Sequence, residues 1–332
     1  MAAGIHVLDV AQVGLEATRG TLVPATSILD HAPGGVVLKR SPNVIRIRNA
    51  GSMASSHRVY PGKDSSIIEV EGAWTYNWAP WWFNLFLGPL ATGAGATADK
   101  TWTFGSAVIS DTGDTLKSAS FELGGKDTRP SEYKVAGVVG QSLSLSIRQD
   151  AEWRFKATLL GTVVTAAAKT GALAALSGIT DVLGTTTKVY ANGTGAAFGT
   201  TQLAGNVISA DIDIKVGPSE RYTLDGQRNP YRIAVTGPRD ISAKVAMEYD
   251  AQTLYTAVHA GTAQRVRIAA TGPTLGASAY GCTIDLPGYW NAADFGDDDG
   301  IVTQELTLGA AYDSTPAADI NAVIINASAS LP

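Results

Sequence analysis

"NWAPWWFNLFLG", residues 77–88, is the most aromatic stretch of this chain and the one that best indicates its fold. Its apolar residues recur at i, i+3, i+4, i+7 and i+8, which places them on one face of an α-helix. These residues are Trp78, Trp81, Trp82, Leu85 and Phe86. The segment is too short to cross a membrane, because a spanning helix needs about 20 apolar residues. The pattern therefore predicts a short helix with one wide apolar face.

The residues around this face predict where the helix begins and ends. Asn77 can cap its N-terminus, and Pro80 is tolerated in a first turn. Gly88, followed by a proline, is a typical stop. Two interpretations of the apolar face remain open. We favour packing against a sheet of the same domain, and the alternative is an exposed patch for a partner subunit.

A second segment, "SAKVAMEYDAQTLYTAVHAG" at residues 242–261, repeats this arrangement. When Gly261 is aligned with Gly88, a capping aspartate falls on Asn77. Both segments read as an alternating strand, a cap, a short amphipathic helix and a glycine stop. The second helix is less aromatic. Its predicted packing residues are Leu254, Tyr255 and Val258.

Another pair of segments suggests that the repeat extends further. "GVVGQSLSL" begins at Gly137 and "GIVTQELTL" begins at Gly300, and the two match when these glycines are aligned. The order and type of the elements agree between the two alignments. We interpret them as an internal duplication of a unit of about 165 residues, which is the size of a domain rather than of a solenoid repeat.

Alternating apolar and polar residues dominate both units. Such alternation is typical of half-buried strands, and each unit contains about six or seven of them with one helix. We therefore predict a mainly β protein with two tandem sandwich or barrel-like domains, each with a short flanking helix. The predicted divisions are an N-terminal arm (1–30), a first domain (31–161), an Ala/Gly/Thr-rich connection that opens the second unit (162–205), and a second domain (206–332).

The composition excludes several classes of protein. Charged residues are only 17% of the 332 residues, the net charge is −5, and hydrophobic residues are 45%. A negative chain is a poor general nucleic-acid binder, and a low charge fraction suits large covered interfaces. The single cysteine, Cys282, excludes an internal disulfide and lies in an alternating stretch typical of a strand. We expect neither a signal peptide nor a membrane-spanning segment.

No catalytic or cofactor motif with the required spacing is present. The four histidines are scattered, and the hydrolase, metalloprotease and phosphate-binding patterns are missing. "DFGDDDG", from Asp294 to Gly300, is dense in carboxylates but lacks the EF-hand spacing. It is read as a solvated acidic loop, with a bound cation as the alternative. We therefore expect no enzyme activity, cofactor or specific metal site.

Several features together resemble the major tail tube proteins of long-tailed bacteriophages. They are the opening "AQVGLEATRGTLVPAT" (residues 11–26), a long loop between two early strands, a strand that runs into an aromatic helix, and the later "GVVGQSLSL" strand. The resemblance implies a structural virion protein, made in the host cytoplasm, with no membrane partner. It also implies rings of six β-sandwich domains that stack into a tube. The inner sheets would line a channel for DNA and the tape-measure protein, and other tail proteins would be further partners.

The duplication changes what the resemblance implies for this chain. Three copies, each with two domains, would form a pseudo-sixfold ring. The N-terminal arm, Met1–Asp30, and the loop Ala50–Asp64 would make ring-to-ring contacts. Both helices would cover their own sandwich and reach a neighbouring domain. Residues on one polar strand face are candidates for lining the channel, namely Ser142, Ser144, Glu305 and Thr307.

Two other readings remain. The chain could be another ring-forming tail component, such as a terminator or a baseplate ring protein. It could also be a two-domain carbohydrate- or receptor-binding β protein. Aromatic residues at helical spacing disfavour the second reading, because sugar-binding aromatics are expected on exposed strands or loops.

Overall fold

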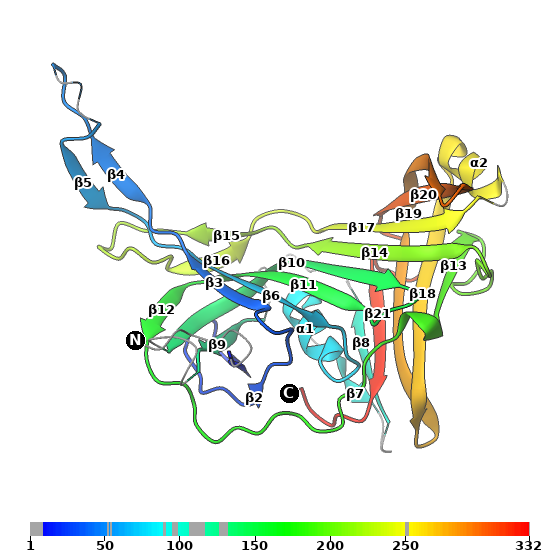
Figure 1. Ribbon diagram of the computed structural model, residues 1–332, viewed down its shortest axis with the longest axis horizontal. Helices are drawn as coiled ribbons and strands as arrows, with labels where there is room; N and C mark the ends of the chain where they lie inside the picture. The colour runs from blue at the N-terminus through cyan, green and yellow to red at the C-terminus, as the bar shows by residue number, and fades with distance from the viewer. Residues whose placement is uncertain are drawn as a thin grey trace.

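A computed structural model describes residues 9–51, 53, 55–88, 91–94, 99–105, 117–125, 132–249 and 252–331. Within these residues the protein is mainly β, with the two helices α1 (Ala79–Leu87) and α2 (Gln252–Ala260) and one short 3-10 turn (Gly184–Thr186) (Figure 1). The predicted fold class is confirmed. Both helices begin and end close to the predicted residues.

The strands fall into a first and a second half of the chain. Those of the first half are β1 (Ala11–Leu15), β2 (Ser27–Ile28), β3 (Val36–Arg40), β4 (Val44–Ile47), β5 (Arg58–Pro61), β6 (Ser66–Ala73), β7 (Ala91–Ala94), β8 (Lys100–Gly105), β9 (Ala119–Leu123), β10 (Tyr133–Arg148), β11 (Arg154–Gly161) and β12 (Val163–Ala166). Those of the second half are β13 (Thr187–Gly193), β14 (Val207–Lys215), β15 (Pro218–Arg221), β16 (Arg232–Val235), β17 (Asp240–Glu248), β18 (Ala263–Leu275), β19 (Ser278–Asp298), β20 (Ile301–Ala310) and β21 (Asn321–Asn326).

One large antiparallel sheet contains strands from both halves. Its order is β3-β6-β11-β10 from the first half, followed by β14-β17-β20-β19 from the second. The two halves meet where β10 pairs with β14, with Ser142 opposite Lys215 and Arg148 opposite Ser209. This junction is continuous hydrogen-bonded sheet rather than a loose linker.

β10 and β19 each pair with different strands along their length. The first part of β10 pairs with β9 and β12, and the first part of β19 pairs with β18 and β21. Each strand then passes into the large sheet beside a register shift, just after Gly140 or just before Ala292. A side chain at Gly140 would lie 2.6 Å from the ring of Phe86, so close packing on α1 requires glycine there. These bends wrap the outer strands around the core.

The duplication is visible in the pairing of the strands. The alignment of Gly88 with Gly261 maps α1 onto α2 from end to end, and it places β6 on β17. The hairpin β4–β5 corresponds to β15–β16, and each hairpin connects two strands of the large sheet. The pair β9–β10 corresponds to β18–β19, β11 to β20, and β12 to β21. The two halves therefore share one topology, to which the first adds β2 and the hairpin β7–β8.

The second sequence alignment, of Gly137 with Gly300, is wrong. It placed the segment from Gly137, in β10, on the segment from Gly300, which leads into β20. In the structure β20 lies between β17 and β19, as β11 lies between β6 and β10. The counterpart of β20 is therefore β11. Strands with the same two-residue alternation match each other equally well, so the pattern alone could not identify the right pair.

Two local predictions also need correction. Asn77 does not cap α1, because its side-chain oxygen accepts a hydrogen bond from the Thr180 backbone N–H, at 3.0 Å. The Thr75 hydroxyl instead accepts from the Trp78 N–H near the start of the helix. The predicted N-terminal arm is partly folded on its own chain: β1 pairs with β9, and β2 pairs with β1. Residues 1–8 of that arm lie outside the described residues.

The predicted connection between the units is also divided between the two halves. β12 lies within residues 162–205 and pairs with β10, and β13 lies within the same segment and pairs with β18. In Figure 1 an extended segment between β12 and β13 runs below the strands of the first half. It forms isolated bridges from Ala175 to Ile28 and from Asp181 to Thr75.

Candidate assembly surfaces and channel face

The five apolar residues predicted on the first helix are all buried. Trp78, Trp81, Trp82, Leu85 and Phe86 lie in the core with relative exposures of 2% or less. The Trp82 ring lies 4.8 Å from that of Trp81 in an edge contact and 4.8 Å from that of Phe155. α1 packs against β10, β8 and β21. It therefore acts as a core element that connects the two halves, and its first function is packing within the chain.

The second helix is far less covered. Leu254, Tyr255 and Val258 are half-buried, and no described residue of α2 is fully buried. Tyr255 lies between the rings of His259, at 4.5 Å, and Phe295, at 5.4 Å. α2 packs against β19, as α1 packs against β10. Its outward side is a candidate contact surface.

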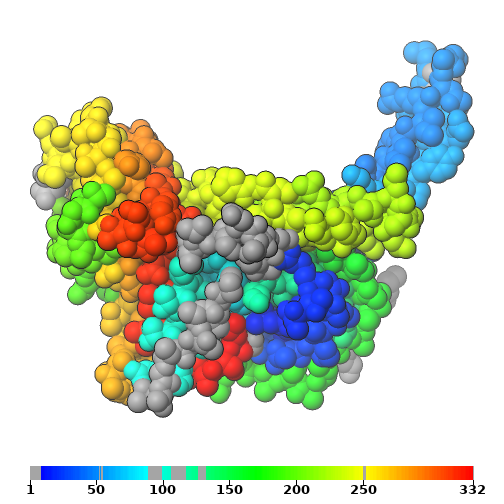
Figure 2. Space-filling model, turned by 180° about the vertical axis from the view of Figure 1, so that it is seen from behind, coloured from blue at the N-terminus to red at the C-terminus, as the bar shows by residue number. Residues whose placement is uncertain are grey.

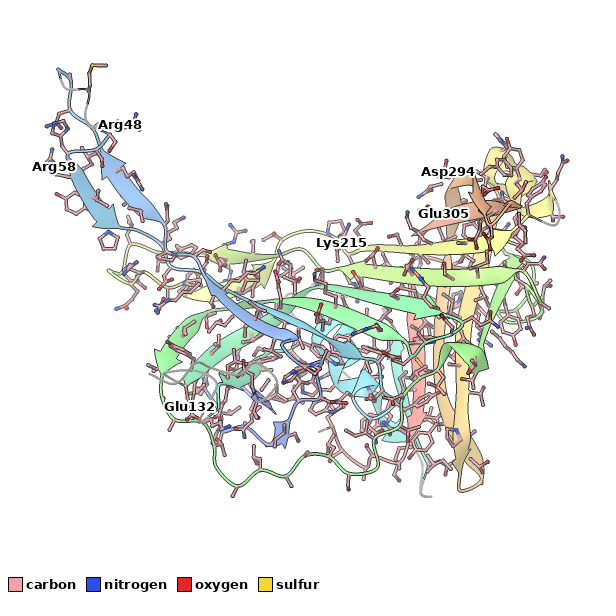
Figure 3. The ribbon with its side chains drawn as sticks, in the orientation of Figure 1. Arg48, Arg58, Glu132, Lys215, Asp294 and Glu305 are labelled. Atoms are coloured by element: carbon pink, nitrogen blue, oxygen red, sulfur yellow. The ribbon has the colours of Figure 1, made fainter. Side chains whose placement is uncertain are left out.

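The four candidate channel residues lie on one face of the large sheet. Residues directly opposite in a ladder share a face, and so do residues two apart on one strand. Ser144 is opposite Asp213, and Ser142 lies two residues away. Thr307 is opposite Lys244, which is opposite Asp211, whose other neighbour is Ser146. Glu305 lies two residues from Thr307, so the structure brings all four onto the face turned away from α1 (Figure 3).

Carboxylates outnumber basic side chains on this face, which is named the channel face for its candidate role. Its acidic residues are Glu69, Glu71, Asp211, Asp213, Asp240, Glu248, Asp294, Asp298 and Glu305. Its basic residues are Lys39, Arg148, Arg154, Lys156, Lys215 and Lys244. Several are paired across strands, as in Lys244 with Glu305 at 2.7 Å and Arg148 with Asp211 at 3.1 Å. The face is thus polar and mildly acidic, and several of its basic groups are held in ion pairs.

The predicted long loop is a projecting hairpin. β4 and β5 pair with each other and stand clear of the body in Figures 1 and 2. Val44, Ile45, Val59 and Tyr60 are exposed on it, and an isolated two-stranded hairpin is marginally stable in water. Its equivalent, β15–β16, lies at its base, where Arg228 Nε donates to the Gly62 carbonyl at 2.8 Å. The projecting hairpin is a second candidate contact surface.

Buried carboxylates hold the N-terminal segment in place. Glu16, from the phrase that carried the resemblance, accepts hydrogen bonds from the backbone N–H groups of Gly20 and Gly137 and from the Ser118 and Ser120 hydroxyls. Such a set satisfies both carboxylate oxygens away from water. Sequence reasoning missed this role, although Glu16 lies in residues 11–26, the segment most typical of the tail tube family.

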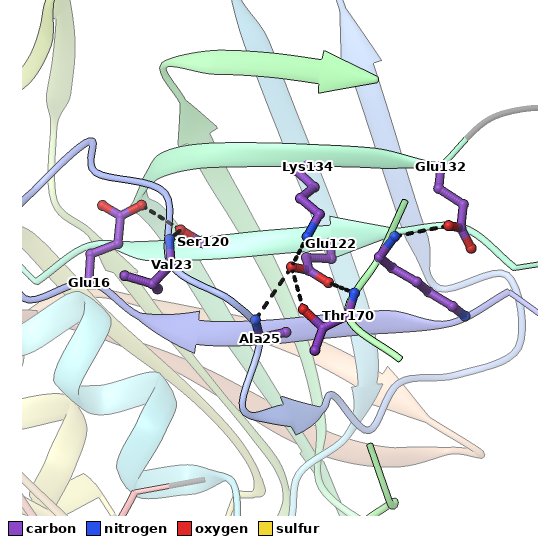
Figure 4. Close-up of polar contacts among 9 residues, drawn as sticks. Glu16, Val23, Ala25, Ser120, Glu122, Glu132, Lys134 and Thr170 are labelled. Atoms are coloured by element: carbon purple, nitrogen blue, oxygen red, sulfur yellow. Dashed lines mark hydrogen bonds and ion pairs between the residues drawn. The ribbon is translucent and has the colours of Figure 1, made fainter. Parts of the chain in front are cut away.

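Glu122 has a similar role on the neighbouring strand β9 (Figure 4). It accepts from Lys134 Nζ at 2.7 Å, from the Thr170 hydroxyl at 3.0 Å and from the Ala25 N–H at 3.4 Å. Burial alone would raise the pKa of Glu122, but the hydrogen bonds from Lys134 and Thr170 outweigh it and lower the pKa. The ionised carboxylate therefore holds the segments around residues 25 and 170 against strand β9, which pairs with β1 and β10.

The other candidate chemical groups have structural surroundings. Cys282 is fully buried, and burial raises the pKa of its thiol to about 12, so the thiolate needed of a nucleophile does not form near neutral pH. Asp294–Asp298 belong to β19, and the acidic segment ends in a tight turn to β20 rather than in an irregular loop. No group of three or more metal-ligating side chains occurs among the described residues. In that same part of the chain, no helix is long and apolar enough to span a membrane.

A comparison with protein families identifies the kind of protein to which these surfaces belong. Residues 10–310 match the family described as phage tail tube protein. The chain belongs to the phage tail tube protein family. The match spans both halves of this tail tube protein, so the projecting hairpin, both helices and the channel face all lie inside it. It identifies a structural component of the virion tail.

A comparison with solved structures finds a likeness to the SPP1 tail tube, which was determined by solid-state NMR and cryo-electron microscopy. The two chains are 19% identical, with 39% of this tail tube protein and 74% of that chain covered. The TM-score is 0.29. Among curated proteins no match is found.

Proposed function

We propose that three copies of this chain close into a ring of six equivalent units, and that the rings stack into the tail tube. The supporting observation is the large sheet, in which two equivalent four-stranded blocks follow one another in the same direction with a continuous polar face. A head-to-tail arrangement that is already repeated once within a chain closes into a ring when it continues at a constant rotation.

The size of such a ring fits a channel for DNA. Three copies of eight strands, spaced about 4.8 Å apart and tilted by about 40°, form a barrel with a diameter of roughly 48 Å between backbones. Side chains narrow this value but leave room for a DNA duplex. The inner surface would be the channel face, with Ser142, Ser144, Glu305 and Thr307 among its residues.

The electrostatics of that face suit passage rather than binding. DNA binding is driven by basic side chains that neutralise phosphates and release counterions. Here acidic residues exceed basic ones, and cross-strand ion pairs engage several of the basic groups. DNA and the tape-measure protein are the proposed contents of the channel, and the other tail proteins are proposed partners at its ends.

The projecting hairpin β4–β5 is proposed to contact the next ring. It exposes apolar residues on a narrow two-stranded arm, which is the kind of surface that gains from being covered. Arg46 in β4, together with Arg48 and Arg58 (Figure 3), adds positive charge to the arm. The N-terminal residues are proposed to contribute to the same contact.

Electron microscopy of the purified protein, with particle mass measured in parallel, tests this proposal. We expect hollow tubes or stacked rings with three chains in each ring. Six chains per ring would contradict the pseudo-sixfold arrangement while keeping the tube. Single rings that never stack at high concentration would contradict the tube and indicate a terminator or baseplate ring. A monomer under all conditions would contradict both.

A further inference from the structure

We propose that successive rings are joined through unlike halves of the chain. In this contact the basic hairpin β4–β5 of one copy binds the acidic turn between β19 and β20 of a copy in the next ring. The inference rests on the proposed function, and it adds the surface that receives the hairpin and the chemistry that selects it. The partner is a second copy of this chain, and its receiving surface, residues 294–302, is named the acidic turn.

The hairpin and the acidic turn lie at opposite ends of the strands of the large sheet. At one end β3 finishes at Arg40, where the chain leaves the large sheet for the hairpin. At the other end β20 begins at Ile301, within the acidic turn. Figures 1 and 3 show the two at opposite ends of the longest axis, with Arg48 and Arg58 at one end and Asp294 at the other. Since barrel strands run from one rim to the other, the hairpin and the turn belong to opposite rims of a ring.

The two surfaces carry opposite charge. Residues 41–63 contain four basic side chains and neither Asp nor Glu, so the hairpin segment has a charge of +4 with His57 neutral. Residues 288–304 contain four Asp and no basic side chain, so the segment of the acidic turn has a charge of −4. The charged residues are Arg46, Arg48, Arg58 and Lys63 in the first segment and Asp294, Asp297, Asp298 and Asp299 in the second. Both charges are large beside the net charge of −5 for the whole chain.

The arginines of the hairpin have no acidic partner in the described part of the chain. Arg46, Arg48 and Arg58 are exposed, and no ion pair joins any of them to a carboxylate there. Arg40, at the base of the hairpin, is by contrast paired with Asp64. The unpaired positive charge is thus concentrated where the hairpin stands clear of the body.

The acidic turn likewise has no basic partner among the described residues. Its four Asp side chains are exposed and form no ion pair there. Asp297 accepts a hydrogen bond from the Gly300 N–H at 3.2 Å, which shapes the turn. The charge of Lys244 reaches Asp294, but Lys244 Nζ donates to Glu305 at 2.7 Å. The negative charge of the turn is therefore available to a partner.

Both surfaces also expose apolar side chains. On the hairpin these are Val44, Ile45, Val59 and Tyr60, and at the acidic turn they are Phe295, Ile301 and Val302. Apolar groups at the centre of an interface supply affinity, and complementary charges around them select the partner and its orientation. Two surfaces that combine exposed apolar groups with charges of opposite sign therefore suit each other.

The counterparts of the two surfaces within the same chain lack this contrast. The turn between β10 and β11 is the counterpart of the acidic turn, and its residues 148–154 include two basic and two acidic side chains, so it is neutral. Its Arg148 is paired with Asp211 at 3.1 Å. The hairpin β15–β16 has two carboxylates among four arginines over residues 216–239. Each copy therefore presents one basic hairpin and one acidic turn, which gives three of each in a ring of three copies.

This one-to-one count determines how two rings face each other. The hairpin belongs to the first half of the chain and the acidic turn to the second half. A first half of one ring therefore stands against a second half of the next ring. The contact joins rings in three equivalent orientations, whereas six identical units would permit six.

Stacking through opposite charges should depend on salt. The electrostatic screening length falls from about 10 Å at 0.1 M salt to about 3 Å at 1 M. Over that range the ring concentration needed for tubes should rise about tenfold, because the charges are exposed and are screened effectively. The mass of a single ring should not change. Light scattering and electron microscopy measure both quantities.

Charge reversal on each surface tests the contact directly. Two triple variants change the charge of the hairpin segment from +4 to −2 and that of the turn segment from −4 to +2. They are Arg46→Glu/Arg48→Glu/Arg58→Glu, the hairpin variant, and Asp294→Lys/Asp297→Lys/Asp298→Lys, the turn variant. Asp299 is kept, because its φ of 56° lies in a region that Asp tolerates better than most residues. Each variant alone should form rings of parental mass but no tubes.

Mixing the two variants separates loss of the contact from loss of folding. When their preformed rings are combined, the negative hairpin of one variant faces the positive turn of the other. At the following interface the unchanged hairpin faces the unchanged turn. The mixture should therefore form tubes of alternating rings, although neither variant does so alone. The control Asp150→Asn/Glu152→Gln changes the neutral counterpart turn and should stack as the parent does.

Milder variants keep the test valid if a triple variant fails to form rings. Arg48→Gln/Arg58→Gln and Asp294→Asn/Asp298→Asn remove charge without reversing it. Each should raise the ring concentration needed for tubes about tenfold, since complementary charges at the contact are lost. Unchanged stacking in both would overturn the contact.

The outcomes of the reversal experiment have separate meanings. Tubes from both triple variants alone would overturn the contact. Tubes from the turn variant but not from the hairpin variant would overturn the receiving surface and leave the proposed role of the hairpin in stacking. A mixture that forms no tubes, although each variant forms rings, would show that the two surfaces are not partners. Absence of rings in the parent protein would overturn the proposed function itself.

Discussion

The two helices occupy the same place in the two halves of the chain but differ in what covers them. α1 is wholly buried, because it packs against β10, β8 and β21. α2 packs on β19 and has no fully buried residue. The difference shows that β21, from the second half, helps to complete the core of the first half. The first half has this cover within the chain, and we expect the second half to gain it from another copy.

The corresponding hairpins β4–β5 and β15–β16 also differ in how far they are buried. β15–β16 lies at the base of the first hairpin, with Pro218 and Ile233 buried, whereas β4–β5 projects with exposed apolar residues. Equivalent elements have thus taken different roles, one in packing within the chain and one in reaching away from it. Duplication within one chain permits such specialisation, which identical subunits could not acquire.

The largest expected effect comes from breaking the covered helix. Trp82→Ala should reduce the free energy of unfolding by about 3–5 kcal/mol, because it removes a fully buried indole that contacts Trp81 and Phe155. Chemical denaturation followed by tryptophan fluorescence and circular dichroism measures this. Trp82→Phe is the matched control and should lose less. Equal loss in the two variants would show that ring size at this position does not matter.

A buried carboxylate of the first half should give the next largest effect. Glu122→Gln should cost about 1–3 kcal/mol near neutral pH, because a charge-assisted network is weakened. The folded-state pKa lies below the usual value of 4.5, so the stabilisation is present above about pH 4.5 and is lost as the pH falls through the folded pKa. As the pH is lowered from 7 through the folded pKa, the unfolding free energies of the parent and the variant should therefore converge.

An exposed ion pair of the channel face provides the control for that series. Glu305→Gln removes the partner of Lys244, and both side chains are largely exposed. The stability should change far less than in Glu122→Gln, as is usual for surface pairs. A loss as large as that of Glu122→Gln would contradict the contrast between buried and exposed carboxylates.

The uncovered helix should respond in assembly rather than in folding. Tyr255→Ala stands at the counterpart of Trp82 and should change the stability of the unassembled chain by no more than about 1 kcal/mol, because the side chain is half-buried. Ring formation, measured by light scattering against concentration, should weaken at least tenfold. Normal assembly in this variant would show that α2 is not part of the contact between copies.

The smallest effect on folding should come from the projecting hairpin. Replacement of residues 49–56 by an Asn-Gly turn should leave the melting temperature of the single chain within about 2 °C, since the paired residues of β4 and β5 stay in place. Rings should form but fail to stack in electron micrographs. Tubes of normal length would show that stacking does not depend on the hairpin.

Part of this structure was predictable from local patterns. The helix around Trp82 and the corresponding helix around Tyr255 were predicted with nearly correct bounds. The signals for them, the helical spacing of apolar residues and the glycine stops, act within a few residues. Alternation also placed Ser142 with Ser144, and Glu305 with Thr307, on one face of their own strands, whereas the ladders decided that the two strands share that face. The choice of strand partner did not, because the strands from Gly137 and Gly300 carry the same alternation.

The sequence by itself determined that this protein is a duplicated, mainly β chain with one short helix in each unit and no recognisable catalytic motif. Only the tertiary structure decided which helix is covered, which hairpin projects and which strands pair. Periodicity reports the burial of a residue within its own element, at a range of a few residues. The burial of α1 depends on strands such as β21, which lies far from α1 in sequence. The two elements come together only when the sheet forms.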